Sequence, residues 1–202
     1  MANPFRRAIV VLLFMLAAGI ACGRHEAGGE AAGMKKIIMV ISESNFRDEE
    51  FLEPREIFKK AGLEVKIASS ALGEARGALG ARVRPDVLVS DIRPEDFDAI
   101  VFVGGQGASR YWDDPSVHKL IRNAAADGKV IAAICIAPVT LAKSGVLKGR
   151  RATVWHSEGA QIQKAGAVYT AKGVERDGRV ITASGPDYAG EFGREIVAAL
   201  SQ

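Results

Sequence analysis

Three short and almost uninterrupted apolar runs restrict most strongly what this chain can fold into. They are residues 36–42 (KIIMVIS), 99–103 (AIVFV) and 130–134 (VIAAI). Each run has the length of a β-strand, and none shows the alternation of apolar and polar residues that a half-exposed strand requires. Strands that are apolar on both faces are typical of a parallel sheet that is covered on both sides.

Stretches with helical periodicity separate these runs. Residues 51–61 carry apolar side chains at helical spacing, with Pro54 in the first turn, and residues 117–124 repeat the pattern after an Asp-Pro pair. Alternating strands and helices predict a doubly wound α/β fold with a mostly parallel central sheet. Three further elements are expected: a turn or hairpin over 73–85, a strand over 180–183 and a closing helix over 189–200.

The first 22 residues have the features of an export signal. Residues 1–7 contain two arginines and no acid, residues 8–21 carry no charge, and Cys22 follows them. The apolar run is shorter than the roughly 20 residues of a transmembrane helix and suits the core of a signal peptide. Small residues ahead of Cys22 resemble a bacterial lipobox, although Gly19 stands where leucine is usual. The signal would then end at Cys22, which would be acylated.

Two alternatives to lipidation stay open. The signal could be cleaved in the ordinary way near Ala21, or translation could start at Met34 and leave the protein in the cytoplasm. Residues 23–33 are rich in glycine and alanine without an apolar period, which predicts a flexible tether. The globular domain is therefore expected over residues 34–202. A lipid on Cys22 would hold it at the cell envelope, on the periplasmic side of the outer membrane if the cell has two membranes.

Composition and charge argue against several classes of function. The chain has 27 Lys and Arg against 24 Asp and Glu, a formal net charge of +3, with no basic stripe of the kind that binds nucleic acid. Its two cysteines and three histidines lack metal-ligand spacing, so we expect neither a metal nor a cofactor. The Gly105-Gln106-Gly107 run lacks the further residues of a dinucleotide-binding or P-loop motif.

Three segments follow the apolar strands at what should be one edge of the sheet: residues 43–50, 104–108 and 135–138. Open α/β sheets bind ligands at the carboxyl ends of their strands. Cys135 lies between a buried strand and a helix expected to start near Pro138, which is the arrangement of a nucleophile elbow. A helix N-terminus there would favour the thiolate. By position alone, Cys135 is equally well explained as a small buried hydrophobic residue.

Four motifs resemble the ThiJ/PfpI superfamily and occur in that family's order. They are ESNFRDEEFLEP from residue 43, VFVGGQGA from residue 101, AAICIAP around Cys135 and VERDGRVITASGPDYAGEF from residue 174. The resemblance covers residues 34–201. It implies a flavodoxin-like, class I glutamine amidotransferase-like three-layer sandwich, usually a homodimer, with Cys135 as its functional centre.

The same resemblance assigns partners to Cys135. Glu50 matches a glutamate that hydrogen-bonds the cysteine, and such a carboxyl group must be protonated beside a thiolate because two adjacent anions repel each other. A neutral carboxyl group would donate to the sulfur and lower the pKa of the thiol. Gly105 matches a glycine whose amide, with that of Ile136, would hold an oxyanion or an oxidised sulfur. The two acids before Glu50 are expected to be solvated.

The chain departs from the family close to the cysteine. A histidine follows the cysteine in the peptidase-like branch, but Ile136 stands there and cannot accept a proton, which argues against cysteine peptidase activity. Other branches have a histidine in the segment of Trp155 and His156. Trp155 occupies that position by count, and a shift of one residue reverses the side-chain direction on an extended segment. His156 is thus either a site residue or a surface histidine. Arg47 replaces an acid that is common in relatives, and its role stays open.

Three functions fit these residues. Cys135 could add to a small reactive carbonyl such as methylglyoxal or its adducts while Glu50 moves protons, as in the glyoxalase and deglycase branches of the family. Cys135 could instead be oxidised to sulfinic acid as an oxidative-stress sensor, or the domain could be a chaperone-like binding module without turnover. The expected partners are a carbonyl substrate or an oxidant, the membrane through Cys22 and a second copy of the chain, but no nucleic acid.

Overall fold

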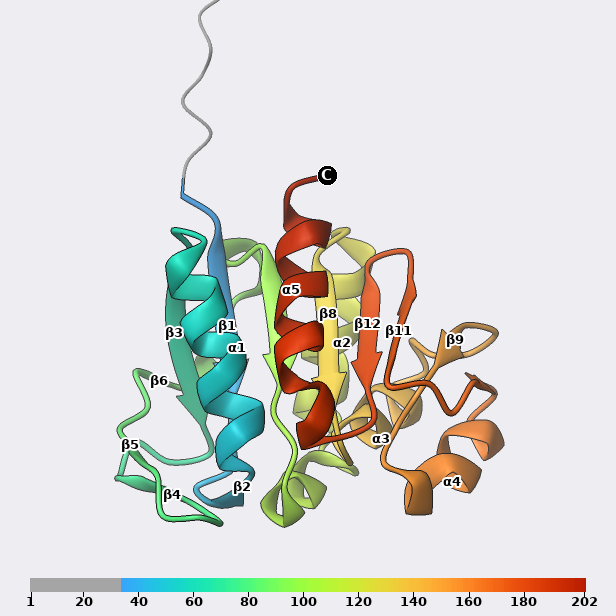
Figure 1. Cartoon of the computed structure of the whole chain (residues 1–202), viewed down its shortest axis with the longest axis horizontal. Coiled ribbons are helices and arrows are strands. Elements are labelled where there is room, and N and C mark those ends of the chain that lie inside the picture. The colour runs from blue at the N-terminus through green and yellow to red at the C-terminus, as the bar shows by residue number, and fades with distance from the viewer. Residues whose placement is uncertain (1–33) are drawn as a thin grey trace, which may run out of the picture. The chain divides into compact units, whose positions relative to one another are not determined.

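The computed structural model describes residues 34–202, so the predictions of a signal peptide, an acylated Cys22 and a tether lie outside the described residues. Within residues 34–202 a seven-stranded sheet forms the centre, in the order β11-β12-β8-β7-β1-β3-β6 (Figure 1). Neighbouring strands are parallel except for β11, which is antiparallel to β12. The strand bounds are Lys36–Val40 (β1), Glu64–Ser69 (β3), Val87–Leu88 (β6), Ala99–Phe102 (β7), Val130–Ile134 (β8), Val174–Asp177 (β11) and Val180–Ala183 (β12).

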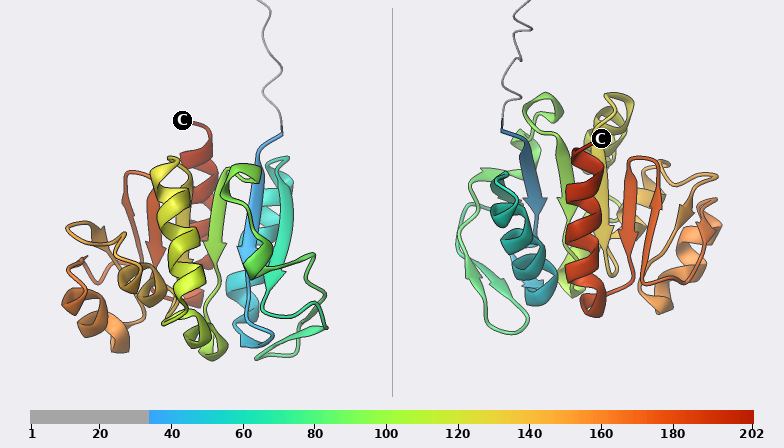
Figure 2. Two further views of the ribbon diagram at one scale, coloured as in Figure 1. Left: turned by 180° about the vertical axis from the view of Figure 1, so that it is seen from behind. Right: turned by 45° about the horizontal axis from the view of Figure 1, so that its top comes forward.

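Helices cover both faces of the sheet. The helix bounds are Asp48–Lys60 (α1), Pro115–Ala126 (α2), Pro138–Lys143 (α3), Gly159–Lys164 (α4) and Ala189–Leu200 (α5). α1 and α5 lie side by side on one face, and α2 and α3 lie on the other (Figures 1 and 2). This is the flavodoxin-like three-layer sandwich that was predicted. None of the helices in residues 34–202 has the length and apolarity needed to cross a membrane.

The continuous apolar strands are explained by this layering. Successive side chains of a strand point to opposite faces of the sheet. Ile37 and Met39 of β1 therefore belong to the core layer that contains Phe51 of α1, whereas Ile38 belongs to the layer that contains Ile121 of α2. All five side chains are fully buried. A run of apolar residues without alternation is thus the consequence of a sheet that is covered on both sides.

α1 begins three residues earlier than the apolar spacing predicts, at Asp48. The earlier start moves Pro54 from the expected first turn into the helix interior, where it lacks the N–H that would bond the carbonyl of Glu50. Asp48, Glu49 and Glu50 make up the first turn instead, where the helix dipole favours negative charge. Because of this early start, Glu50 is part of a rigid helix.

Shorter strands form two small sheets beside the main one. The hairpin expected over residues 73–85 is present, with β4 (Ala75–Gly77) antiparallel to β5 (Arg82–Val83). β2 (Ser44–Phe46) pairs with β4 in parallel. β9 (Arg151–Ala152) and β10 (Val168–Tyr169) form a separate parallel pair. The hairpin lies near the N-terminus of α1 and so borders the edge of the main sheet where the strands end (Figure 1).

Candidate active site

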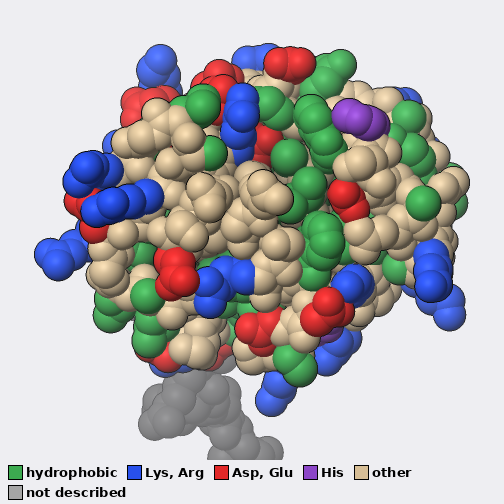
Figure 3. Space-filling view, turned by 90° about the horizontal axis from the view of Figure 1, so that it is seen from below, with side chains coloured by type: hydrophobic (Ala, Val, Ile, Leu, Met, Phe, Trp, Pro, Cys, Tyr) green, Lys and Arg blue, Asp and Glu red, His purple; other side chains and the backbone are tan. Residues whose placement is uncertain are grey.

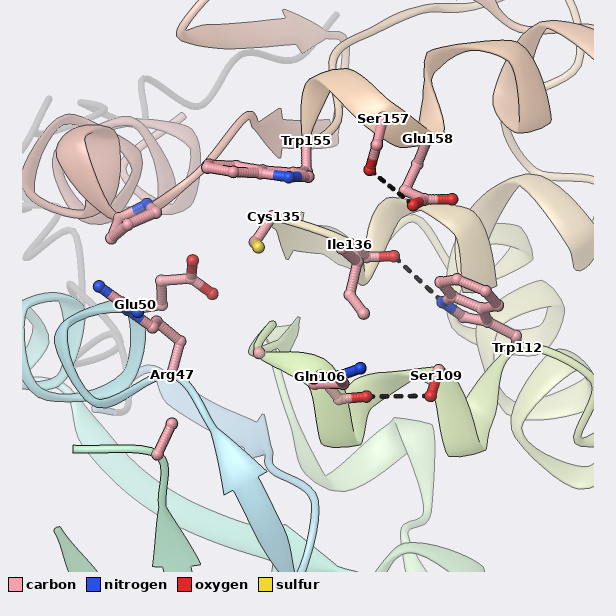
Figure 4. A pocket seen from close by; sticks show the side chains of 13 residues that line it. Arg47, Glu50, Gln106, Ser109, Trp112, Cys135, Ile136, Trp155, Ser157 and Glu158 are labelled. Carbon is pink, nitrogen blue, oxygen red and sulfur yellow. Dashed lines mark hydrogen bonds between the residues drawn. The ribbon is translucent and has the colours of Figure 1, made fainter. Parts of the chain in front are cut away.

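The carboxyl ends of β1, β7 and β8 meet at the lower edge of the sheet in Figure 1. A cavity of about 610 Å³ opens at this edge. Glu50, from the segment after β1, lines it together with Gly105, from the segment after β7, and Cys135 and Ile136, which follow β8. The structure therefore brings together four residues that the sequence singled out. Figure 4 labels three of them, Glu50, Cys135 and Ile136.

Cys135 has a strained backbone conformation. It follows β8 directly and has a φ of 62°, in the left-handed region that costs a residue with a side chain about 1–2 kcal/mol. Its N–H donates to the carbonyl of Ala183 (2.9 Å), and its carbonyl accepts from the N–H of Trp155 (2.8 Å). Hydrogen bonds from two separate segments thus hold the turn, which points the half-buried thiol into the cavity. This is the geometry of a nucleophile elbow.

Glu50 is buried beside the cysteine. Its exposed fraction is 0%, and neither carboxyl oxygen makes a hydrogen bond of ordinary geometry. Burial raises the pKa of this carboxyl group to about 8, although the thiol of Cys135, the charge of Arg47 and the amide of Gly104 each lower it. A carboxylate at this position would lose its hydration without gaining enough partners. Glu50 therefore carries its proton at neutral pH, as expected for a carboxyl group beside a reactive sulfur.

The pKa of the Cys135 thiol is raised to about 12, which is opposite in direction to the lowered pKa that we expected. Burial is the largest cause and the charge of ionised Glu50 is the second, whereas the amides of Gly105 and Ile136 lower the pKa. The charge of Glu50 contributes only after that carboxyl group has lost its proton. The sulfur is thus a thiol at neutral pH, and its proton must leave during attack on a substrate.

Gly104 is a site residue that the sequence patterns did not single out. A β-carbon at this position would lie 2.5 Å from the β-carbon of Cys135 and would collide with the carboxyl group of Glu50. Gly105 has a φ of 86°, and a β-carbon there would lie 2.5 Å from the carbonyl oxygen of Asn45. The two glycines therefore let acid, thiol and backbone approach one another. The signal that could have found Gly104 is a Gly-Gly pair directly after a buried strand.

We expected Asp48 to be a solvated surface acid, but it is buried. It is only 5% exposed and accepts hydrogen bonds from the N–H groups of Leu79 (2.8 Å) and Ala81 (2.6 Å), in the loop of the β4–β5 hairpin. These bonds tie the hairpin to the first turn of α1. They also hold Ala78, which lines the cavity. An acid that looked like a surface residue therefore shapes the rim of the site.

Two charged side chains line the cavity on opposite sides of Cys135 (Figure 4). Arg47 lies on the side of the buried acid and pairs with Glu49 at 2.9 Å. Glu158 lies on the other side and accepts a hydrogen bond from the hydroxyl of Ser157 (2.7 Å). No local sequence pattern marks Glu158 as a site residue, because it reaches the cavity from a segment that follows Cys135 by more than twenty residues.

Trp155, and not His156, lies next to the cysteine. Trp155 lines the cavity, whereas His156 is exposed and is not part of its lining. His156 lines a smaller hollow that shares Trp155 with the cysteine cavity. On the remaining wall the indole N–H of Trp112 donates to the carbonyl of Ile136 (3.1 Å) and so holds the peptide that follows Cys135. Trp112, like Glu158, is a site residue that no local sequence pattern marked.

Charges of both signs lie at the end of the molecule where the cavity opens. Figure 3 looks onto this end of the molecule, where Lys and Arg side chains are interleaved with Asp and Glu side chains. Among residues 34–202, no three His, Cys, Asp or Glu side chains are grouped so that they could hold a metal ion. The polar groups that act on the sulfur of Cys135 are the buried Glu50 and the amides of Gly105 and Ile136.

The fold and the elbow cysteine define the class of this protein as a flavodoxin-like α/β sandwich with a thiol at the carboxyl edge of its sheet. The chain belongs to the DJ-1/PfpI family, whose model matches residues 35–199. The structure of a ThiJ/PfpI domain protein from Brachyspira murdochii superposes with a TM-score of 0.81 at 32% identity, over 84% of this chain and 98% of that one.

Proteins with and without a named activity are similar in sequence to this chain. An uncharacterized protein of Methanocaldococcus jannaschii is 38% identical over 200 residues, which is 98% of each chain. A glutathione-independent glyoxalase of Caenorhabditis elegans is 30% identical over 84% of this chain and 90% of its own. Deglycase PfpI of Pyrococcus furiosus is 31% identical over 81% of this chain and 98% of its own.

The buried acid should make the protein less stable as the pH rises. The pKa of Glu50 is about 8 in the folded state against 4.5 for an ordinary glutamate, so the folded state holds an extra proton in this window. The stabilisation of the folded state by this extra proton is complete below pH 4.5 and is lost by about pH 8. Glu50→Gln has no such proton. We expect the variant to gain stability relative to the wild type by roughly 3–5 kcal/mol between pH 4.5 and 8.

Urea unfolding at several pH values measures this difference. Glu53→Gln is the matched control, because Glu53 is an exposed acid on the same helix, and its profile should run parallel to that of the wild type. Parallel profiles for Glu50→Gln and the wild type would show that Glu50 is ionised in the folded protein and would contradict the raised pKa.

Proposed function

We propose that this protein converts small reactive carbonyl compounds, such as methylglyoxal or its adducts, through a covalent adduct on Cys135. The observation that carries the proposal is an elbow cysteine against a buried carboxyl group whose pKa, about 8, suits proton transfer near neutral pH. The names of two relatives, a glyoxalase and a deglycase, support the same class of reaction.

In the first step the sulfur of Cys135 bonds to the aldehyde carbon. Because the pKa of the thiol is raised, the sulfur needs a proton acceptor during the attack, and the ionised fraction of Glu50 is the acceptor beside it. The proton then passes from Glu50 to the former carbonyl oxygen. The amides of Gly105 and Ile136 stabilise the negative charge on that oxygen before the proton arrives.

In the second step Glu50 moves a proton between two carbons of the substrate. It takes the proton of the former aldehyde carbon, which leaves an enediol, and returns it to the neighbouring ketone carbon. The hydroxyl proton on the first carbon passes at the same time to the oxygen on the second carbon. The first carbon is thereby oxidised to a thioester and the second is reduced to an alcohol, so no external oxidant or reductant is required. Water then cleaves the thioester, which releases a 2-hydroxy acid and the free thiol of Cys135.

Glu50 performs both proton transfers in this scheme because the position after the cysteine has no base. Ile136 replaces the histidine of the peptidase-like branch, and His156 lies outside the cysteine cavity. A peptidase would also need a group that takes the thiol proton and then, as a general acid, gives it to the amine leaving group. The site therefore supports carbonyl chemistry better than peptide hydrolysis.

Oxidation of Cys135 to sulfinic acid is a second candidate. The amides of Gly105 and Ile136 favour negative charge on the sulfur, and protonated Glu50 is placed to donate to a sulfinate oxygen. These are the same groups that would stabilise an oxyanion in turnover. A sensor and an enzyme can therefore share this site.

Export and lipid anchoring through Cys22 complete the proposal. The positive charge and apolar run of residues 1–21 support a signal peptide. The 200-residue match with the Methanocaldococcus protein extends well ahead of Met34, which supports a protein that includes this segment.

Replacing the nucleophile should abolish carbonyl turnover. Purified protein should consume methylglyoxal and form a hydroxy acid, Cys135→Ser should fall to the background rate, and Glu50→Gln should lose about 100-fold in kcat/KM. His156→Ala is the matched control and should retain the wild-type rate, because His156 is not part of the cavity. Equal consumption by the wild type and Cys135→Ser would refute the proposal.

Mild peroxide treatment tests the second candidate. Mass spectrometry of peptides should show a selective gain of two oxygens on Cys135, which Glu50→Leu should reduce because it removes the donor. Oxidation that spares Cys135, or that proceeds equally in the variant, would count against a role as a sensor.

Metabolic labelling with a radioactive fatty acid tests the anchor. The protein should carry the label and sediment with membranes, and Cys22→Ala should lose both properties. Cys135→Ala is the matched control and should keep them. A label-free protein in the soluble fraction would instead favour ordinary cleavage or a start at Met34.

A further inference from the structure

A second hollow, of about 210 Å³, shares Trp155 with the cysteine cavity. Four ring side chains line it: Trp155, His156, Tyr169 and Tyr188. Two of these are unusually accessible for large rings, since Trp155 is 37% and Tyr188 40% exposed. Trp155 and His156 are neighbours in the chain, whereas Tyr169 and Tyr188 come from two other segments that meet them only in the folded protein. Exposed aromatic groups gathered around one hollow point to a binding surface.

Three of the rings pack against glycine. In each pair, a β-carbon on the glycine would lie within 3 Å of the ring, so a larger residue would push the ring away. The pairs are Trp155–Gly185, Tyr169–Gly159 and Tyr188–Gly173. Contact with the backbone restricts how the rings can move, and a hollow whose walls are already in place needs little ordering when a ligand enters.

The charge of the lining selects the kind of ligand. Among the described residues that line the hollow, Asp187 is the only carboxylate, and there is no Lys or Arg. Aromatic faces and a carboxylate both attract positive charge. A metal ion such as Ca²⁺ would need six or more oxygen ligands, which this lining does not offer. A cation with a diffuse charge and an apolar surface fits these walls better.

We propose that the hollow binds an alkylammonium group, with the faces of Trp155, Tyr169 and Tyr188 around the cation and Asp187 balancing its charge. The site needs neither the thiol of Cys135 nor the buried acid, so it stands independently of the chemistry proposed above. Its volume is several times the roughly 30 Å³ that a water molecule occupies in the liquid, which is enough for a small head group.

Choline is the probe, and 3,3-dimethyl-1-butanol is its control ligand, because the alcohol has the same shape without the charge. Calorimetric titration of the protein should show saturable binding of choline, with the alcohol at least about tenfold weaker. Tyr188→Leu should weaken choline binding about fivefold or more, whereas Tyr188→Phe should retain it because the ring face remains.

Asp187→Asn should also weaken choline binding. Asp127→Asn is its matched control and should have no effect, because Asp127 is an exposed acid at the C-terminal end of α2. Absence of saturable choline binding, equal binding of the alcohol, or an unchanged affinity in Tyr188→Leu would each overturn the proposal.

NMR of the wild-type protein decides the question if Tyr188→Leu fails to fold. Choline should shift the indole N–H signal of Trp155 and leave that of Trp112 in place; a shift of Trp112 instead would place choline in the cysteine cavity and overturn the proposal. Affinity that falls as the protein concentration rises would mean that a second copy of the chain covers the hollow, which would overturn it as well.

Discussion

The carboxyl group of Glu50 is buried against Cys135 without a hydrogen bond of ordinary geometry, and the structure of the site depends on keeping it there. Because α1 starts early, Glu50 belongs to a rigid helix. Gly104 has no side chain, which leaves space for the carboxyl group of Glu50 to contact Cys135. Burial removes the hydration that an ionised carboxylate needs, so the group keeps its proton near neutral pH. A neutral acid at this point allows negative charge to develop on a nearby sulfur or oxygen.

Cys135 and Glu50 are both held in energetically unfavourable states. Cys135 has a left-handed backbone conformation, and Glu50 is an acid that is buried away from water. Each costs on the order of a few kcal/mol, and such costs persist only where the surrounding structure imposes them. Here two core layers, one on each face of the sheet, supply the stabilisation that offsets them. The strained site therefore depends on the stability of the packed sheet that holds it.

Local patterns predicted the fold best where burial is most complete. β1, β7 and β8 are apolar on both faces, and their positions followed from that alone. β3 was not predicted, because Glu64 and Lys66 interrupt its apolar pattern. α4 was not predicted because Ile162 is its only large buried apolar side chain, which is too little to show a helical period. The start of α1 was misplaced because its first turn is made of acids, which contribute nothing to an apolar period.

The sequence by itself determined the layered sheet, the elbow at Cys135 and membership of the family, because each of the three follows from short local runs of residues and their order in the chain. Only the tertiary structure decided that Asp48 clamps a hairpin while Glu50 lies against the thiol, and that Trp155 instead of His156 lines the cavity. It also decided that the pKa of Cys135 is raised. Burial, and the distance between groups from separate segments, set hydration and charge interactions, and neither quantity is encoded in a local run of residues.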